Sequence, residues 1–317
     1  MYHHPIILRL LAALACLVFS PSSCTNKNSP PDSRPLVVAT TTIVADMARV
    51  IGGDLIRVET LMGPGIDPHN YVPKLSDTHL LEKADLILYN GLHLEGRLQS
   101  TLEAMAKRGS HAVAITSAIP PDSLLTPQGD FQGTKDPHVW GDPTLWATTI
   151  NTTVQALAKA FPDGSQEFQS RGETYRAELE KLTTWANSRF AEIPKEKRIL
   201  VTSHDAFHYF GRAFGFEVHG LQGVSTAVEA GIKDRSNLVT LLRQRGVRTI
   251  FAESSINPKA IAAVAGEALI TLSPQSLYSD SLDSPGSTAS IHGETYDKGT
   301  YIGMIKHNVN SIVEGLR

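Results

Sequence analysis

Two copies of one tripeptide, Asp67-Pro68-His69 and Asp136-Pro137-His138, are the clearest chemical feature of the sequence. A chain of this composition would contain about 0.03 such copies by chance. Proline fixes its own φ and holds the preceding residue in extended geometry, so each histidine leaves its loop on a restricted backbone. Because such imidazoles have little entropy left to lose, the pattern indicates a preformed metal site. The alternative is two ordinary turns, since Asp and Pro are common turn residues.

A third histidine, His204, lies where a predicted strand at 199–202 gives way to a helix. Open α/β sheets bind ligands at the carboxyl ends of their strands, which makes His204 a candidate ligand. The same segment offers a rival, because His204 and His208 at i and i+4 are similar to the zinc-hydrolase pattern His-Glu-x-x-His, with Asp205 in place of the general base Glu. A zinc-dependent hydrolase that uses His204 and His208 therefore remains an alternative.

Several carboxylates could support these histidines. Asp67 and Asp136 each precede Pro-His, where a carboxylate can accept a proton from a ligand imidazole and fix its tautomer, or can cap its own turn. Glu253 follows a predicted strand at 249–252 and should lie near the carboxyl edge of a sheet, and Glu229 is a further candidate.

Short apolar runs alternate with helical stretches along most of the chain, which predicts an α/β fold with parallel-type sheets flanked by helices. The expected strands are 36–40, 55–61, 86–89, 112–115, 199–202, 217–221, 249–252 and 269–272, and the expected helices are 42–51 with Thr42 as its cap, 75–83, 205–214, 233–245, 258–267 and 298–316.

Residues 165–193 differ from this alternation of short strands and helices, because apolar side chains recur there at intervals of three, four or seven residues. This periodicity predicts one amphipathic helix roughly 40 Å long. Nearly 300 residues also exceed a single ordinary core. We therefore expect an N-terminal lobe at 35–164, a connecting helix at 165–194 and a C-terminal lobe at 195–317.

The first 23 residues carry one charged side chain, Arg9, before an apolar stretch at 10–19. Such a stretch is too short for the about 20 residues of a membrane span and indicates a signal peptide at 1–23, hence an exported protein in the periplasm or on the outer face of the cytoplasmic membrane. Cys24 follows two serines and resembles the lipidated cysteine of bacterial lipoproteins, although Pro21 stands where that pattern prefers an aliphatic residue. Residues 24–34 would then be a lipid-anchored tether.

Loss of Arg9 with the signal changes the formal net charge from −3 to −4, so no basic surface for nucleic acid is implied. Cys16 would leave with the signal and Cys24 would carry lipid. The mature chain would therefore hold no disulfide, and its stability would come from its core.

Seven segments together resemble a known family, the substrate-binding lipoproteins of bacterial zinc, manganese and iron ABC importers, the TroA-like group. They are Val38-Ala39-Thr40-Thr41-Thr42, Gly65-Ile66-Asp67-Pro68-His69, Ala84-Asp85-Leu86-Ile87-Leu88-Tyr89-Asn90-Gly91, Asp136-Pro137-His138-Val139-Trp140, Thr202-Ser203-His204-Asp205-Ala206-Phe207, Glu253-Ser254-Ser255-Ile256-Asn257-Pro258-Lys259 and Leu277-Tyr278-Ser279-Asp280-Ser281-Leu282. The resemblance implies two α/β lobes joined by one long helix, with metal between them.

Carried over by position, the resemblance implies the ligands His69, His138, His204 and Asp280. Asp283 competes with Asp280 for the fourth position, and only the family's Asp-x-Leu pattern favours Asp280. The resemblance also implies one divalent cargo ion, Zn²⁺, Mn²⁺ or Fe²⁺, and a membrane permease with its ATPase as partners. We expect a monomer. We also expect that it is not an enzyme, because four ligands leave no open position for an activated water. A surface adhesin with a structural metal is the other alternative.

Overall fold

The computed structural model describes residues 1–2, 32–109, 111–127, 134–291 and 293–317. The predicted signal peptide, Cys24 and most of the tether lie outside the described residues. Residues 34–317 form one compact unit. Within it we keep the predicted boundaries as names, the N-terminal lobe for 35–164 and the C-terminal lobe for 195–317.

The N-terminal lobe is built on a four-stranded parallel sheet in the order β2-β1-β3-β4. Its elements are β1 Leu36–Ala39, α1 Thr42–Gly52, β2 Arg57–Thr60, α2 Leu75–Lys83, β3 Leu86–Tyr89, α3 Gln99–Lys107 and β4 Ala112–Ala114. Every residue of β1 and β3 is buried, as expected of central strands covered on both faces, and this explains their unbroken apolar sequences. The predicted strands and helices of this lobe are confirmed, but α3 and α4 Pro143–Ala160 were not predicted.

The C-terminal lobe repeats this arrangement. Its elements are β5 Ile199–Thr202, α6 His208–Phe214, β6 Glu217–Gly220, α7 Ile232–Arg245, β7 Thr249–Ile250, α8 Lys259–Ala268 and β8 Thr271–Leu272. β5 pairs with β6 and β7 with β8, all parallel, and a backbone hydrogen bond of 2.9 Å from Phe251 to Val201 joins the two pairs. An antiparallel hairpin that was not predicted, β9 Thr288–Ile291 and β10 Glu294–Asp297, precedes α9 Tyr301–Leu316.

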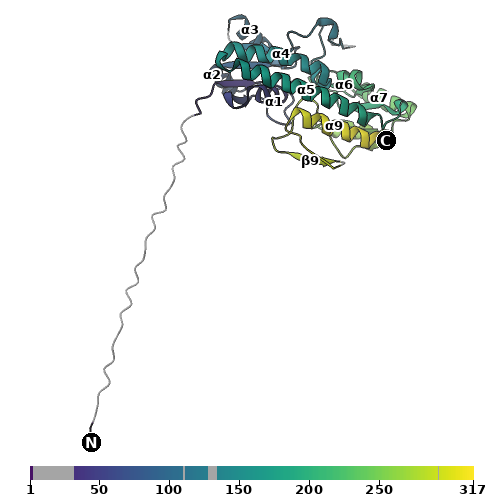
Figure 1. Cartoon of the computed structure of the whole chain (residues 1–317). Coiled ribbons are helices and arrows are strands. Elements are labelled where there is room, and N and C mark those ends of the chain that lie inside the picture. The colour runs from purple at the N-terminus through teal and green to yellow at the C-terminus, as the bar shows by residue number, and fades with distance from the viewer. Residues whose placement is uncertain (3–31, 110, 128–133, 292) are drawn as a thin grey trace. The chain divides into compact units, whose positions relative to one another are not determined.

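Helix α5, Ser165–Phe190, confirms the predicted connecting helix and ends four residues before the predicted end at 194. Its 26 residues give a length of about 39 Å. It packs against α4 Pro143–Ala160 and α9, as Figure 1 shows. One continuous apolar core includes side chains of both sheets and the buried stripe of α5, so the two lobes share their packing.

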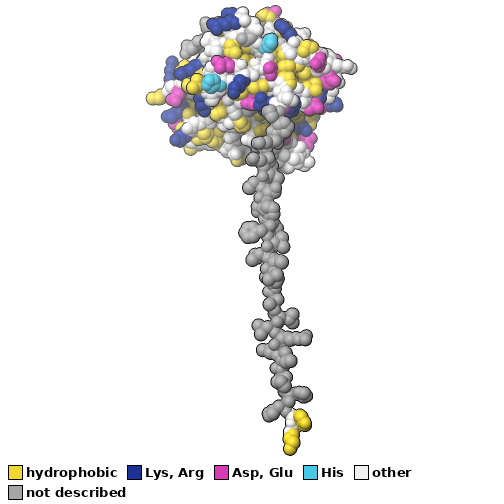
Figure 2. Space-filling view, turned by 90° about the vertical axis from the view of Figure 1, so that its left-hand side faces the viewer, with side chains coloured by type: hydrophobic (Ala, Val, Ile, Leu, Met, Phe, Trp, Pro, Cys, Tyr) yellow, Lys and Arg dark blue, Asp and Glu magenta, His cyan; other side chains and the backbone are white. Residues whose placement is uncertain are grey.

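Thr41, not the predicted Thr42, caps helix α1, because the Thr41 hydroxyl accepts the backbone N–H of Val44. The Thr42 hydroxyl instead accepts the backbone N–H of Leu282, 2.7 Å away in the C-terminal lobe. On the face drawn in Figure 2, Lys and Arg side chains are interspersed with Asp and Glu. Among the helices that the structure describes, none is long and apolar enough to cross a membrane.

Candidate metal centre

Four side chains that the sequence singled out converge at the carboxyl ends of the two sheets. His69 lies between β2 and α2, His138 precedes α4, His204 follows β5, and Asp280 lies between β8 and β9. One ligand atom from each lies within 4.8 Å of the others. The exposed fractions of the four residues are 6%, 0%, 0% and 1% in that order. The site is therefore a buried polar cluster to which distant parts of the chain contribute.

The separations between ligand atoms fit a single ion. His69 Nε2 lies 3.2 Å from His138 Nε2, and the Asp280 oxygens lie 3.4 Å from His138 Nε2 and 3.3 Å from His204 Nε2. A tetrahedral zinc ion with bonds of about 2.0 to 2.1 Å would place its ligands about 3.3 to 3.4 Å apart. These three separations therefore match the edges of a metal shell.

Three buried polar atoms of the four candidate ligands lack hydrogen-bond partners among the described residues. In the described part of the chain, neither oxygen of Asp280 accepts a hydrogen bond, and neither does Nε2 of His204. Buried polar atoms are nearly always satisfied, and an unsatisfied group calls for an explanation. A cation bound between the four side chains supplies one, because it would coordinate these same atoms.

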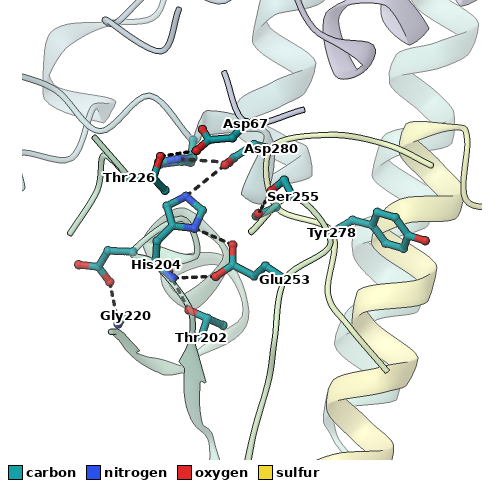
Figure 3. A network of polar contacts seen from close by, with 12 residues as sticks. Asp67, Thr202, His204, Gly220, Thr226, Glu253, Ser255, Tyr278 and Asp280 are labelled. Atoms are coloured by element: carbon teal, nitrogen blue, oxygen red, sulfur yellow. Dashed lines mark hydrogen bonds and ion pairs between the residues drawn. The ribbon is translucent and has the colours of Figure 1, made fainter. Parts of the chain in front are cut away.

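Glu253 holds His204 by hydrogen bonds to its backbone and to the Nδ1 edge of its ring. Its carboxylate accepts two hydrogen bonds from His204, one from the backbone N–H at 2.8 Å and one from Nδ1 at 2.6 Å (Figure 3). With Nδ1 as the donor, the lone pair on Nε2 points toward Asp280. Glu253 is itself 2% exposed, so this contact is shielded from water. The arrangement is the outer-shell carboxylate that commonly orients a metal-binding imidazole.

Asp136 has the corresponding position behind His138. Its Oδ1 accepts the backbone N–H of His138 at 3.0 Å and the ring Nδ1 at 2.7 Å, so it caps its turn and fixes the tautomer at once. Asp67 acts differently. Its Oδ1 accepts the backbone N–H of His69, while its Oδ2 accepts hydrogen bonds from Asn70 and Thr226. Of the two roles considered for Asp67, the structure shows the turn cap, and the hydrogen bonds of its carboxylate come from His69 N–H, Asn70 and Thr226 and not from an imidazole.

Comparison with known proteins identifies the family. Residues 37–315 match the family described as ZnuA, zinc-uptake complex component A, periplasmic. The chain belongs to the ZnuA family. It is 38% identical over 315 residues to the manganese-binding lipoprotein MntA of Bacillus subtilis, covering 97% of this chain and 99% of that protein. It is 39% identical over 297 residues to the zinc-binding protein TroA of Treponema pallidum, covering 92% of each.

Solved structures of the family share this fold. The periplasmic zinc-binding protein TroA of Treponema pallidum superposes with a TM-score of 0.82 at 38% identity, over 89% of this chain and 99% of that one. Fe(III)-bound YtgA of Chlamydia trachomatis has a TM-score of 0.77 at 26% identity, over 89% and 98%. The family resemblance and the fold class predicted from the sequence are confirmed.

Charges in this ZnuA-family site are strongly coupled. Burial lowers the pKa of His69 to about 3, assisted by the neighbouring His138 and His204. Burial also disfavours the charged form of His138, but Asp136 and Asp280 outweigh it and raise that pKa to about 9. Burial raises the pKa of Asp280, yet its contacts with His204 and His138 hold it well below its usual value. Burial is likewise outweighed by Glu253 and Asp280, which raise the pKa of His204, so metal binding must displace protons from His138 and His204.

The hydrolase geometry predicted for His204 and His208 is wrong. Helix α6 begins at His208, so His204 precedes it and the two are not one turn apart on one helix. The reason is that Asp205 Oδ1 accepts the backbone N–H of Gly220, which keeps this segment at the sheet edge. The His208 side chain is 38% exposed and contacts Asp205 at 2.9 Å.

The remaining acidic candidates lie elsewhere. Asp283 accepts hydrogen bonds from Tyr278 and Ser287 and contacts Lys298 at 2.9 Å, so it is occupied outside the metal centre. Glu229 is exposed. Sequence reasoning assigned no role to Trp140 and only a helix cap to Thr42, although both contact the segment that carries Asp280. The available signal for Trp140 was its position, because it ends the family-like segment Asp136-Pro137-His138-Val139-Trp140 and follows His138 by two residues.

Proposed function

We propose that this protein is the extracytoplasmic receptor of an ABC metal importer, which captures one divalent transition metal ion between its lobes and delivers it to a permease. The observation that carries the proposal is the convergence of His69, His138, His204 and Asp280 at the spacing of one coordination shell. Membership of the ZnuA family supports it, and so do the metals named for the relatives. The ion is cargo and not a resident cofactor.

The ligand set favours binding over catalysis. A catalytic zinc keeps an open position for water or substrate, whereas three imidazoles and one carboxylate fill a tetrahedral shell. We propose on this ground that the protein has no enzymatic activity of its own. No contact in the described residues favours the hydrolase, and nothing observed favours the adhesin.

We propose that the protein acts at the outer face of the cytoplasmic membrane, as a monomer anchored by lipid on Cys24. Relatives named as lipoproteins support this location. A Cys24→Ala variant should be processed differently and be recovered in the soluble envelope fraction, whereas the parent should partition into detergent. Equal partitioning of the two would refute the anchor.

The cargo is zinc, manganese or iron, since relatives are named for zinc and manganese and one neighbour holds iron. Affinity in a nitrogen and oxygen site follows the Irving–Williams order, so zinc should bind more tightly than manganese in vitro whatever the cargo. Metal content of protein from its native envelope, measured by mass spectrometry without added metal, therefore tests cargo better than affinity does. One equivalent of manganese or iron would name a cargo against the affinity bias.

The binding proposal is tested by metal stoichiometry in His69→Ala and His204→Ala, with circular dichroism as the check on folding. The parent should bind one equivalent and each variant should lose tight binding. His219→Ala is the matched control, because His219 contacts a carboxylate too, Glu217 at 2.8 Å, but outside the site. Variants that fold and bind one equivalent as tightly as the parent would refute the proposed site.

A further inference from the structure

The segment that carries Asp280 passes from one lobe to the other. At Leu277 it still belongs to the C-terminal sheet, where it donates to the carbonyl of Ala252 at 2.9 Å and accepts from the N–H of Ser254 at 2.9 Å. Asn308 in α9 then holds both backbone groups of Tyr278. Up to Tyr278, the segment is therefore fixed by its own lobe.

From residue 279 to residue 282, the segment is hydrogen-bonded mainly by groups of the N-terminal lobe. Three groups of the N-terminal lobe hold positions 279, 281 and 282 around Asp280. The indole Nε1 of Trp140 donates to the carbonyl of Ser279 at 2.8 Å, the backbone N–H of Gly65 donates to Ser281 Oγ at 2.8 Å, and Thr42 Oγ1 accepts the N–H of Leu282 at 2.7 Å. On the C-terminal side, the Ser255 and Ser279 hydroxyls lie 3.3 Å apart. The fourth ligand thus comes from the C-terminal lobe in sequence and is held by the N-terminal lobe in space.

Trp140 contributes more than its hydrogen bond. Its ring packs edge to face against His138, with centroids 5.3 Å apart and planes at 71°. Its own carbonyl accepts the hydroxyl of Tyr301 at 2.7 Å, and Tyr301 is fully buried. Trp140 is 3% exposed, so its indole N–H has no water to bond if Ser279 moves away. One side chain therefore touches one ligand and the backbone next to another.

We propose that Trp140 is a positioning residue for the metal site: by tying the Asp280 loop to the His138 loop, it sets how long the site retains its ion. This inference rests on the proposed metal-binding function and deepens it. Neither oxygen of Asp280 accepts a hydrogen bond in the described residues, and their contacts are with the ring nitrogens of His138 and His204, so outside the site itself the carboxylate is placed by the backbone that carries it. Loss of the Trp140 anchor frees this backbone on one side, and the ion then loses Asp280 before it loses the histidines.

The test compares Trp140→Phe with Trp146→Phe. Phenylalanine at 140 keeps an aromatic ring against His138 and removes only the N–H donor. Trp146 is fully buried in the same lobe, and its indole N–H has no acceptor among the described residues, so its replacement controls for loss of an indole. Thr42→Val removes the second anchor at nearly constant volume.

Affinity and dissociation rate for Zn²⁺ and Mn²⁺ would be measured by chelator competition, and Co²⁺ absorption would report the coordination geometry. Trp140→Phe should weaken binding 10- to 100-fold, the usual cost of removing an outer-shell partner, mainly through faster dissociation, and should change the Co²⁺ spectrum. Thr42→Val should act in the same direction, while Trp146→Phe should stay within about twofold of the parent, since only a group that touches the metal centre changes the ion's shell.

Parent-like affinity and Co²⁺ spectra in both Trp140→Phe and Thr42→Val would overturn the inference. If Trp140→Phe fails to fold, Thr42→Val decides alone. Failure of the parent and of Trp146→Phe to bind any of these ions would instead refute the proposed function, so the two failures are distinguishable.

Discussion

Replacement of Glu253 by glutamine tests whether the site depends on a fixed imidazole tautomer. The Glu253 carboxylate accepts two donors of His204, the backbone N–H and Nδ1–H. A glutamine of the same shape has one oxygen only. If the oxygen faces the backbone, the amide NH₂ faces Nδ1 and drives the proton to Nε2, which removes the lone pair that would bind metal. If the oxygen faces Nδ1, two N–H donors confront one another.

The cost follows from burial. Glu253 is 2% exposed and His204 is fully buried, so water cannot relieve either arrangement. Leaving one buried donor without an acceptor costs about 1 to 3 kcal/mol. That range corresponds to a loss of about 5- to 150-fold in metal affinity.

Metal affinity of Glu253→Gln should be measured by chelator competition between pH 6 and 9. Burial lowers the pKa of His204, but Glu253 and Asp280 outweigh burial and hold it well above its usual value. Loss of Glu253 therefore weakens proton competition at low pH, and the affinity deficit of the variant should grow as pH rises. Glu217→Gln is the matched control, because Glu217 also accepts from a histidine, His219, but is 40% exposed. An affinity equal to the parent at pH 9 would refute the tautomer argument.

Three further outcomes are expected. Burial raises the pKa of Asp46 to about 6, so the folded protein favours the neutral carboxyl and loses up to about 3 kcal/mol of stability as pH rises from about 4 through 6. Asp46→Asn removes this loss, so in denaturant unfolding the variant should gain stability relative to the parent between pH 4 and pH 8. A difference that does not change with pH would contradict this. Gly96→Ala should weaken metal binding more than Gly109→Ala does. Both glycines have positive φ, but a Cβ at Gly96 would lie 2.5 Å from the backbone oxygen of His69, whereas a Cβ at Gly109 would meet open space. Equal effects of the two substitutions in metal titrations would argue against this contact. His208→Ala should retain one equivalent of metal with affinity within about twofold of the parent by the same titration, because an exposed pair such as His208 and Asp205 is worth at most about 1 kcal/mol and lies outside the cluster.

The three histidines of the candidate site could be found from sequence because local geometry places them. His69 and His138 follow prolines that stiffen their loops, and His204 follows a buried strand whose carboxyl end faces the ligand side of the sheet. Glu253 was suspected for the same reason. In each case the evidence lay within a few residues of the ligand.

Asp280 could not be chosen over Asp283 by local reasoning. Both lie in one irregular segment, and the choice depends on the path of residues 279–282, which is set by Trp140 and Thr42 more than 100 positions earlier. Only the family's residue pattern favoured Asp280. The same limit explains the wrong start of α6, since Asp205 bonds to Gly220 on a neighbouring strand.

Helix α4 was missed although its start carries a strong signal. Asp142 accepts the N–H groups of Thr144 and Leu145, and Pro143 occupies the first turn, where its missing N–H costs nothing. Its many threonines have low helix propensity, which hid the signal. Packing of its buried face against α5 supplies the stability that propensity does not.

The architecture bears on which ion the site prefers. Three imidazoles suit zinc, iron and copper alike and do little to separate them, whereas a carboxylate extends acceptance toward manganese. Both oxygens of Asp280 face the site, one toward His138 and one toward His204, so this residue can contribute one donor or two. The rotation available to the Asp280 carboxylate depends on the hydrogen bonds of Trp140 and Thr42 to the backbone on either side of it. The preference between zinc and manganese should therefore reside less in the ligands than in the hydrogen bonds that hold the Asp280 loop, and Trp140→Phe should change the affinity ratio of the two metals as well as each affinity.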